Sequence, residues 1–82
     1  MTVFEEVREV LVAELVLKPE MVKLESKLNE DLGADSLDAA EVVVALEEKF
    51  EVTISEDEAT KVITVNDIVE LINRRLQAKS VS

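Results

Sequence analysis

The apolar residues near the N-terminus recur at the spacing of one helix face. Thr2 and Glu5, three residues apart, form a capping-box pattern at the start of this segment. Pro19 disfavours the helical conformation for the residue before it, Lys18, and so ends the segment. The pattern predicts a first helix over about residues 3–16. Its apolar positions are Val3, Phe4, Val7, Val10, Leu11 and Leu15.

A second amphipathic pattern covers residues 36–50 and has two distinct faces. Asp35 is its natural N-cap, and Asp38 favours the positive end of the helix dipole. On a wheel of about 100° per residue, one side is apolar and is expected to pack in the core. That side holds Ala39, Val42, Val43, Leu46 and Phe50. The opposite side mixes apolar groups with carboxylates and holds Leu37, Ala40, Glu41, Val44, Glu47 and Glu48.

Two further helices are predicted in the C-terminal part of the chain. Ser55 and Glu58 have capping-box spacing and predict a short third helix. A fourth helix is predicted over about residues 65–78, with Thr64 as its cap. Its inward positions are Val65, Ile68, Val69, Ile72 and Leu76.

The first and second helices are joined by a long connection, residues 17–35. Structureless loops of this length are uncommon in a compact domain, so we expect apolar residues to anchor it on the helices. Ser26 is a candidate cap for a short turn, and Gly33, the only glycine, suits a sharp bend. Residues 51–54 have the composition of a strand, but a lone strand would not persist, so we expect a loop. The expected anchors of the long connection are Leu17, Val22, Leu24, Leu28 and Leu32.

These patterns predict an all-α fold, a small four-helix bundle with a long first loop and a short third helix. The chain has 82 residues, the size of one domain. We expect a single domain over residues 1–82, with a disordered tail at residues 79–82.

The charge of the chain is concentrated in its middle. There are 19 acidic and 9 basic residues, which give a net charge of −10. Residues 30–58 hold eleven of the acids and one base, Lys49, while the rest of the chain holds eight of each. Nucleic acid and anionic membrane surfaces are therefore poor partners, and basic protein surfaces are good ones.

Several kinds of chemistry are missing from the composition. The chain has no Cys and no His, which removes a thiolate nucleophile, a disulfide framework, an imidazole base and the usual zinc ligands. A pocket of the usual ligand size would be hard to build without emptying so small a core. We therefore expect neither an enzyme nor a metal site. No signal peptide or apolar run long enough to span a bilayer is recognisable, which favours a cytoplasmic protein.

The mixed face of the second helix has two interpretations. It is either a second buried side with glutamates at its margins, or a surface on which partner proteins dock. In the docking interpretation, Leu37 and Val44 supply apolar contact. Glu41, Glu47 and Glu48 then meet Arg or Lys on the partner, which raises association rates and selects partners.

Ser36 stands at the start of this helix, after a glycine-containing loop and between two aspartates. Serine is common at helix starts, so the position alone indicates no function. The run from Asp31 to Asp38, however, resembles the modification site of acyl carrier proteins. Residues 41–50 resemble their recognition helix, residues 54–59 their third helix, and residues 63–65 the start of their fourth.

This resemblance implies a carrier of acyl groups that serves fatty acid biosynthesis and acts as a monomer. A separate phosphopantetheinyl transferase, with Mg²⁺, would move 4′-phosphopantetheine from coenzyme A to Ser36, within the motif Asp35, Leu37 and Asp38. The terminal thiol of that arm would then hold acyl groups as thioesters. The fold would shelter the acyl chain between its helices. The aliphatic residues expected around it are Val42, Val43, Leu46, Ile54, Ala59, Val62 and Ile68.

Three alternatives differ in what the chain would carry or bind. A carrier for polyketide, peptidyl or other specialised pathways would share the same motif. An unmodified acidic scaffold would use the same helix to bind partners. A calcium-binding loop of the EF-hand type is ruled out, because the positions around Gly33 that would need oxygen ligands include Leu28 and Leu32.

Overall fold

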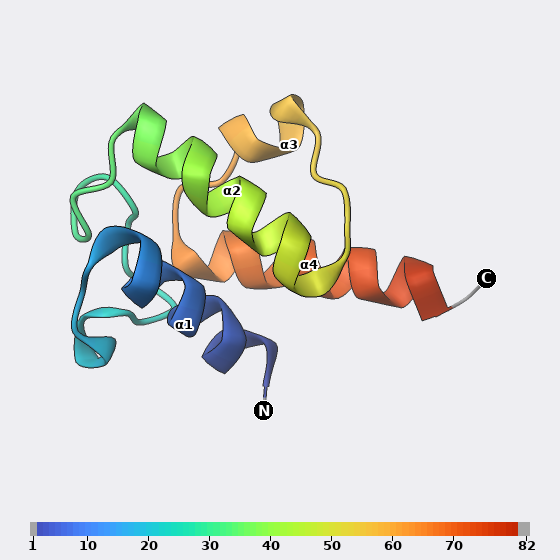
Figure 1. The fold of residues 1–82 in the computed structure, drawn as a ribbon, viewed down its shortest axis with the longest axis horizontal. Helices are drawn as coiled ribbons and strands as arrows, with labels where there is room; N and C mark the ends of the chain where they lie inside the picture. Colours follow the sequence, from blue (N-terminus) through green and yellow to red (C-terminus); the bar gives the residue numbers. More distant parts are fainter. Residues whose placement is uncertain (1, 81–82) are drawn as a thin grey trace.

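The computed structural model describes residues 2–80, which form four α-helices and one short 3-10 helix (Figure 1). Helix α1 packs against both α2 and α4, while the short α3 lies beyond α2 at the edge of the molecule. The predicted all-α bundle, with its long first loop and short third helix, is confirmed. The elements are α1 (Val3–Leu15), η1 (Pro19–Met21), α2 (Ser36–Phe50), α3 (Glu56–Thr60) and α4 (Val65–Ser80).

The core is built from one stripe of each long helix. From α2, the side chains of Val42, Leu46 and Phe50 are buried, whereas the predicted core residues Ala39 and Val43 are only half-buried. From α4, Leu71 joins the predicted inward residues and is buried. The other buried apolar side chains of the cluster are Val7, Val10, Leu11, Val22, Leu32, Ile54, Val65, Ile68 and Ile72.

The capping boxes predicted at α1 and α3 are present. The Thr2 hydroxyl accepts the Glu5 N–H at 3.2 Å, and the Glu5 carboxylate accepts the Thr2 N–H at 2.9 Å. Ser55 and Glu58 make the same reciprocal pair at 3.2 Å and 3.1 Å. Each pair satisfies amides that no helical carbonyl can reach, which is why the two helices begin where the sequence predicts.

Helix α4 is capped by its own side chains and by the long connection. The Thr64 hydroxyl accepts the Asp67 N–H, and the Asp67 carboxylate accepts the N–H groups of Ile63 and Thr64 at 2.9 Å and 3.0 Å. The carbonyls of Ser26 and Leu24 accept the next two amides, those of residues 65 and 66, at 3.0 Å and 2.9 Å. Backbone carbonyls of the long connection, about forty residues earlier in the chain, thus accept the free amides in the first turn of α4.

That arrangement explains how the long connection is anchored. Val22 and Leu32 are buried, and Leu17 and Leu28 pack against the core, as expected. Leu24 does not: its side chain is 42% exposed, and the residue contacts α4 through its backbone carbonyl instead. The expected turn at Ser26 is present, where the buried hydroxyl accepts the Lys23 N–H and donates to the Met21 carbonyl.

Two helix ends differ from the sequence prediction. α1 ends at Leu15, because Val16 takes a left-handed conformation with φ 54° and ψ 59°, not because Pro19 stops it. This turn directs Leu17 back towards the core. α4 continues through Ser80, two residues beyond the predicted end. The last two residues of the predicted disordered tail, 81 and 82, lie outside the described residues, and residues 51–54 form a loop as expected. Within residues 2–80, no helix is both long and apolar enough to cross a membrane.

The conformation of Val16 predicts a stabilising substitution. A left-handed conformation costs an L-residue about 1–2 kcal/mol, and β-branched side chains suit it least. Val16 is 89% exposed, so little packing is lost on replacement. We expect Val16→Asn to raise the free energy of unfolding by about 0.5–1 kcal/mol, because Asn tolerates this conformation. Urea unfolding measures the change. Val16→Ala should gain less, and equal stability of all three chains would contradict the prediction.

The cap on α4 predicts a pH-dependent contribution to stability. Hydrogen bonds from the backbone of Thr64 and then of Ile63 lower the pKa of Asp67. A lowered folded-state pKa means that the contribution is complete above the pKa of an unfolded aspartate and is lost as the pH falls through the folded-state value. Asp67→Ala should therefore cost about 0.5–2 kcal/mol at neutral pH. The difference in the free energy of unfolding between Asp67→Ala and the wild type should shrink as the pH falls, which urea unfolding at several pH values measures. A difference that stays constant with pH would contradict the prediction.

Candidate functional site

Ser36 is held at the tip of a bend that the sequence determines locally. Gly33 opens the bend with φ 73°, a left-handed value that favours glycine. Ala34 is buried and donates its N–H to the Leu28 carbonyl at 2.9 Å, which fixes the bend against the long connection. Ser36 then follows as the first residue of α2, with its side chain exposed. The structure therefore presents a hydroxyl to solvent on a well-anchored helix start.

The two aspartates beside Ser36 cap each other's backbone. The Asp35 carboxylate accepts the Asp38 N–H at 2.9 Å, and the Asp38 carboxylate accepts the Asp35 N–H at 3.3 Å. The predicted N-cap is confirmed, and Asp38 has the additional role of completing a capping box. The amides of Ser36 and Leu37 precede the first intrahelical bonds of α2. Together with the helix dipole, these amides favour an anion at this point.

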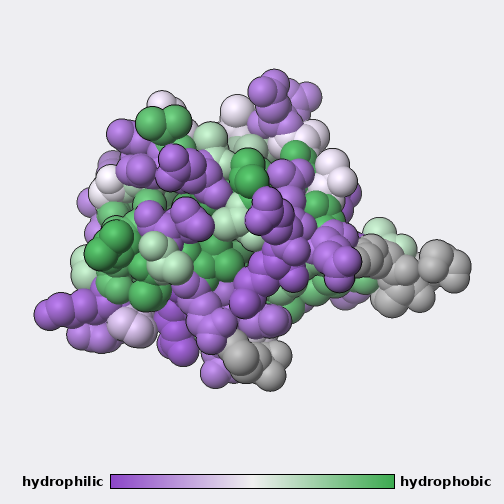
Figure 2. Space-filling view, in the orientation of Figure 1, coloured by the Kyte–Doolittle hydropathy of each residue, from purple (hydrophilic) through white to green (hydrophobic). Residues whose placement is uncertain are grey.

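A groove runs from this helix start between α2 and α3. It has a volume of about 1020 Å³, and its lining extends along α2 from Ser36 to Glu47. That distance corresponds to roughly 16 Å at the rise of an α-helix. On the face of the molecule that Figure 2 draws, hydrophobic side chains are visible among hydrophilic ones. A pocket of ligand size was expected to be hard to build without emptying the core, but this groove lies beside the core and does not empty it.

The groove lining combines aliphatic side chains with polar ones. The polar residues that line it are Asn29, Asp35, Ser36, Glu47, Ser55, Glu56, Asp57 and Thr60. Four of the residues expected to shelter an acyl chain, Val43, Ile54, Ala59 and Val62, line it. The other three of that set are in the buried core instead: Val42 and Leu46 lie on the stripe of α2 that faces the core, and Ile68 lies on α4. The remaining aliphatic lining consists of Leu28, Ala34, Ala39, Ala40, Val44 and Ile63.

The mixed face of α2 is open to solvent. Leu37 is 68% and Val44 is 53% exposed, and Ala40, Glu41 and Glu48 are exposed with them. The interpretation of α2 as a helix buried on two sides is therefore wrong. Of this face, only Ala40, Val44 and Glu47 also line the groove.

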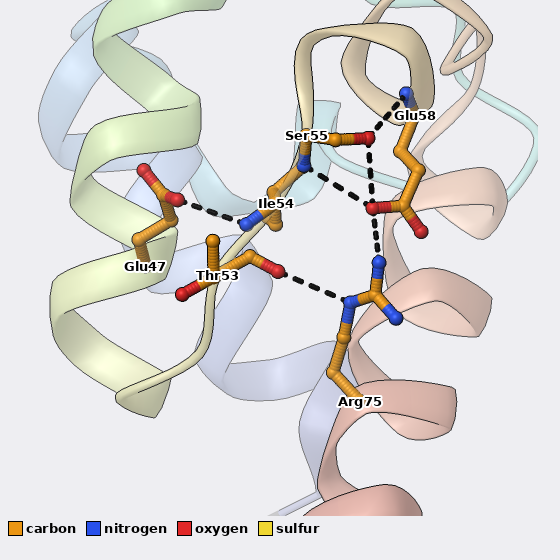
Figure 3. Close-up of polar contacts among 6 residues, drawn as sticks. All are labelled: Glu47, Thr53, Ile54, Ser55, Glu58 and Arg75. Atoms are coloured by element: carbon orange, nitrogen blue, oxygen red, sulfur yellow. Dashed lines mark hydrogen bonds and ion pairs between the residues drawn. The ribbon is translucent and has the colours of Figure 1, made fainter.

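Glu47 differs from the other residues of the predicted docking face. It is half-buried, and its carboxylate accepts the Ile54 N–H at 2.9 Å (Figure 3). This bond fixes the loop after α2 beside the far end of the groove. Glu47 thus holds part of the groove in place, and the exposed carboxylates of the face are those of Glu41 and Glu48.

Two residues near the groove were not identified from the sequence. Ile63, in the α3–α4 connection, lines the groove and is 58% exposed. Arg75, on α4, donates from Nε to the Thr53 carbonyl at 3.1 Å and pairs with the Glu58 carboxylate. The Ser55 N–H, and then Arg75, lower the pKa of Glu58. The spacing of Arg75 from Ile68 places it on the inward side of α4, a signal that could have singled it out.

The site fits a phosphodiester followed by an apolar chain. The exposed Ser36 hydroxyl can form the ester, the first amides of α2 favour the phosphate, and the aliphatic groove begins beside both. The part of the chain that the structure describes contains no group of three or more acidic, His or Cys side chains arranged to hold a metal ion.

Comparisons with known proteins agree with this chemistry. Residues 5–72 match the profile of a family described as "phosphopantetheine attachment site". The chain is 57% identical to the acyl carrier protein of Campylobacter concisus over 74 residues, which cover 90% of this chain and 96% of that one. It is 56% identical to that of Campylobacter fetus over 73 residues (89% and 95%), and 54% identical to that of Wolinella succinogenes over 72 residues (88% and 95%).

Proposed function

This chain belongs to the acyl carrier protein family, and we propose that Ser36 is the residue on which it carries 4′-phosphopantetheine. Its role is that of a carrier in fatty acid metabolism, which holds acyl groups as thioesters while other enzymes act on them. The observation that carries the proposal is the exposed Ser36 hydroxyl at the start of α2, at one end of an aliphatic groove.

Each residue at the helix start has a part in this proposal. Ser36 provides the oxygen that forms the phosphodiester, and the amides of Ser36 and Leu37 interact with its charge. The bound arm supplies the thiol that a chain without cysteine lacks. The carboxylates of Asp35 and Asp38 keep the helix start rigid through the capping box. Their remaining lone pairs attract the basic surface of a transferase.

The groove beside Ser36 is the proposed shelter for the acyl chain. The aliphatic part of its lining, which includes Val43, Ala59 and Val62, matches the acyl chain in polarity. Each methylene that leaves water contributes about 0.8 kcal/mol, before the cost of widening the groove is subtracted. A thioester next to the groove is then kept away from water and from enzymes that should not react with it.

The exposed face of α2 is the proposed docking surface for partner enzymes. Leu37 and Val44 provide apolar contact, and Glu41 and Glu48 provide charge. Phosphopantetheinyl transferase and acyl-processing enzymes with basic surfaces are the expected partners. The monomeric state, the cytoplasmic location and the single-domain boundaries stay predictions.

The attachment site is tested by intact mass. Wild-type chain incubated with transferase, coenzyme A and Mg²⁺ should gain the mass of one arm, and Ser36→Ala should gain none. Because the Ser36 side chain is exposed, its removal should change stability by no more than about 0.5 kcal/mol. Ser80→Ala serves as the control and should be modified fully. An arm on Ser36→Ala would refute the assignment, and an unmodified wild-type chain would favour the scaffold alternative.

The docking surface is tested by charge reversal. Glu41→Lys and Glu48→Lys should each slow modification by the transferase at low salt, because they reverse charge on the exposed face of α2. The effect should fade as salt rises, since exposed charges are screened over about 8 Å at physiological ionic strength. Glu14→Lys makes the same charge change on α1, where the side chain is also exposed. Equal rates for all three variants would place docking elsewhere.

A further inference from the structure

Helix α3 forms one wall of the groove without being part of the core. It has five residues, and none of residues 56–60, all of which the structure describes, is buried. Ala59 packs against the core as a partly buried residue, and Thr60 lines the groove. Ile54 and Val62 anchor the two flanks of α3 in or against the core, but α3 itself offers little apolar surface, so polar contacts contribute to its position.

One side chain from α4 supplies most of those contacts. The Arg75 guanidinium donates to the Thr53 carbonyl, just before α3, and to the Glu58 carboxylate, within it (Figure 3). The same Glu58 oxygen accepts the Ser55 N–H at 3.1 Å and the Ser55 hydroxyl at 3.0 Å. The Arg75 guanidinium thus binds both the backbone just before α3, at Thr53, and the capping box of α3, at Glu58. We call these two contacts of Arg75 the Arg75 tether.

A second bond holds the same segment from the other side. The Glu47 carboxylate on α2 accepts the Ile54 N–H at 2.9 Å. Glu47 lines the groove, whereas Arg75 reaches the segment from α4 and is not among the groove-lining residues described. The Arg75 and Glu58 side chains are 38% and 29% exposed, so their attraction is only partly screened by solvent. Arg75 therefore holds α3 on the side away from the groove, and its contacts involve no residue of the groove lining.

We propose that the Arg75 tether controls how far α3 moves away from α2, and thereby how readily the groove admits an acyl chain. The acyl cargo in this proposal comes from the proposed function. The control of α3 rests on the contacts of Arg75. In this proposal, an acyl chain that enters the groove displaces the α3 wall away from α2. The tether resists that movement, so it lowers the stabilisation that a bound chain provides. Arg75 is a positioning residue in this scheme and contacts no cargo.

The first test uses the unmodified chain and amide hydrogen exchange. In Arg75→Ala, the amides of Ala59, Lys61 and Val62 should exchange about fivefold faster, because their hydrogen bonds lie in and next to α3. Core amides of α2 should change less. Arg74→Ala is the matched control, since it removes the same charge from an exposed neighbour on the same helix. Equal exchange of the α3 amides in the two variants would overturn the proposal.

The second test separates control of the groove from simple stabilisation. Melting temperatures are measured for free-thiol and acylated forms of the wild type, Arg75→Ala and Arg74→Ala, over a series of saturated chain lengths. A merely structural role would lower both forms equally and leave the gain on acylation unchanged. The tether predicts a larger gain in Arg75→Ala, most of all for the longest chains. If acylation raises the melting temperature by the same amount in all three proteins, or in none of them, the proposal is overturned.

A conservative variant and the order of the tests keep the two proposals distinct. Arg75→Lys keeps the charge but cannot reach Thr53 and Glu58 together, so its α3 exchange should fall between wild type and Arg75→Ala. Exchange of the α3 amides that is faster in Arg75→Lys than in Arg75→Ala would oppose the tether. A chain that the transferase leaves unmodified contradicts the proposed function by mass alone. The exchange test then still decides whether Arg75 holds α3.

Discussion

The burial of one narrow stripe of α2 is the constraint on which the rest of the structure depends. Val42, Leu46 and Phe50 join α2 to the core that α1 and α4 complete. A chain of 82 residues has little core to offer, so α2 cannot be buried all round. Its other two sides stay available, one for the groove and one for solvent. The proposed attachment, shelter and docking roles can therefore share a single helix, and only Ala40, Val44 and Glu47 belong to both the mixed face and the groove lining.

Most of the fold could be predicted because its signals are local. The capping boxes at Thr2, Asp35 and Ser55 each need only a donor and an acceptor three residues apart. Such pairs determine where a helix begins whatever the rest of the chain does. Ser36 belongs to the same group, since its exposure follows from its place directly after the N-cap. The helix starts and the proposed attachment site are therefore accessible from the sequence alone.

The features that could not be predicted depend on neighbours that are distant in the sequence. The side chain of Leu24 is exposed while its carbonyl caps α4, a contact that periodicity does not encode. Glu47 lies on the mixed face by its angle on the helix, yet an amide seven residues later turns it towards the groove. A helical wheel assigns a side chain to a face of the helix, but it does not show which other segment of the chain packs against that face. The tether between Arg75 and Glu58 spans seventeen residues and was missed for the same reason.

The uneven distribution of charge adds a reason for that tether. Residues 30–58 carry eleven acids, and their one base, Lys49, pairs with Glu9 on α1 at 3.4 Å. Residues 30–58 therefore contain no further base that could pair with the acids of α3. The first turn of α3 carries three acids, Glu56, Asp57 and Glu58. The helix dipole favours acids at this end, but they still repel one another. The positive charge that holds α3 therefore comes from α4, outside the acidic segment, and Arg75 brings it without placing a base on the acidic face of α2.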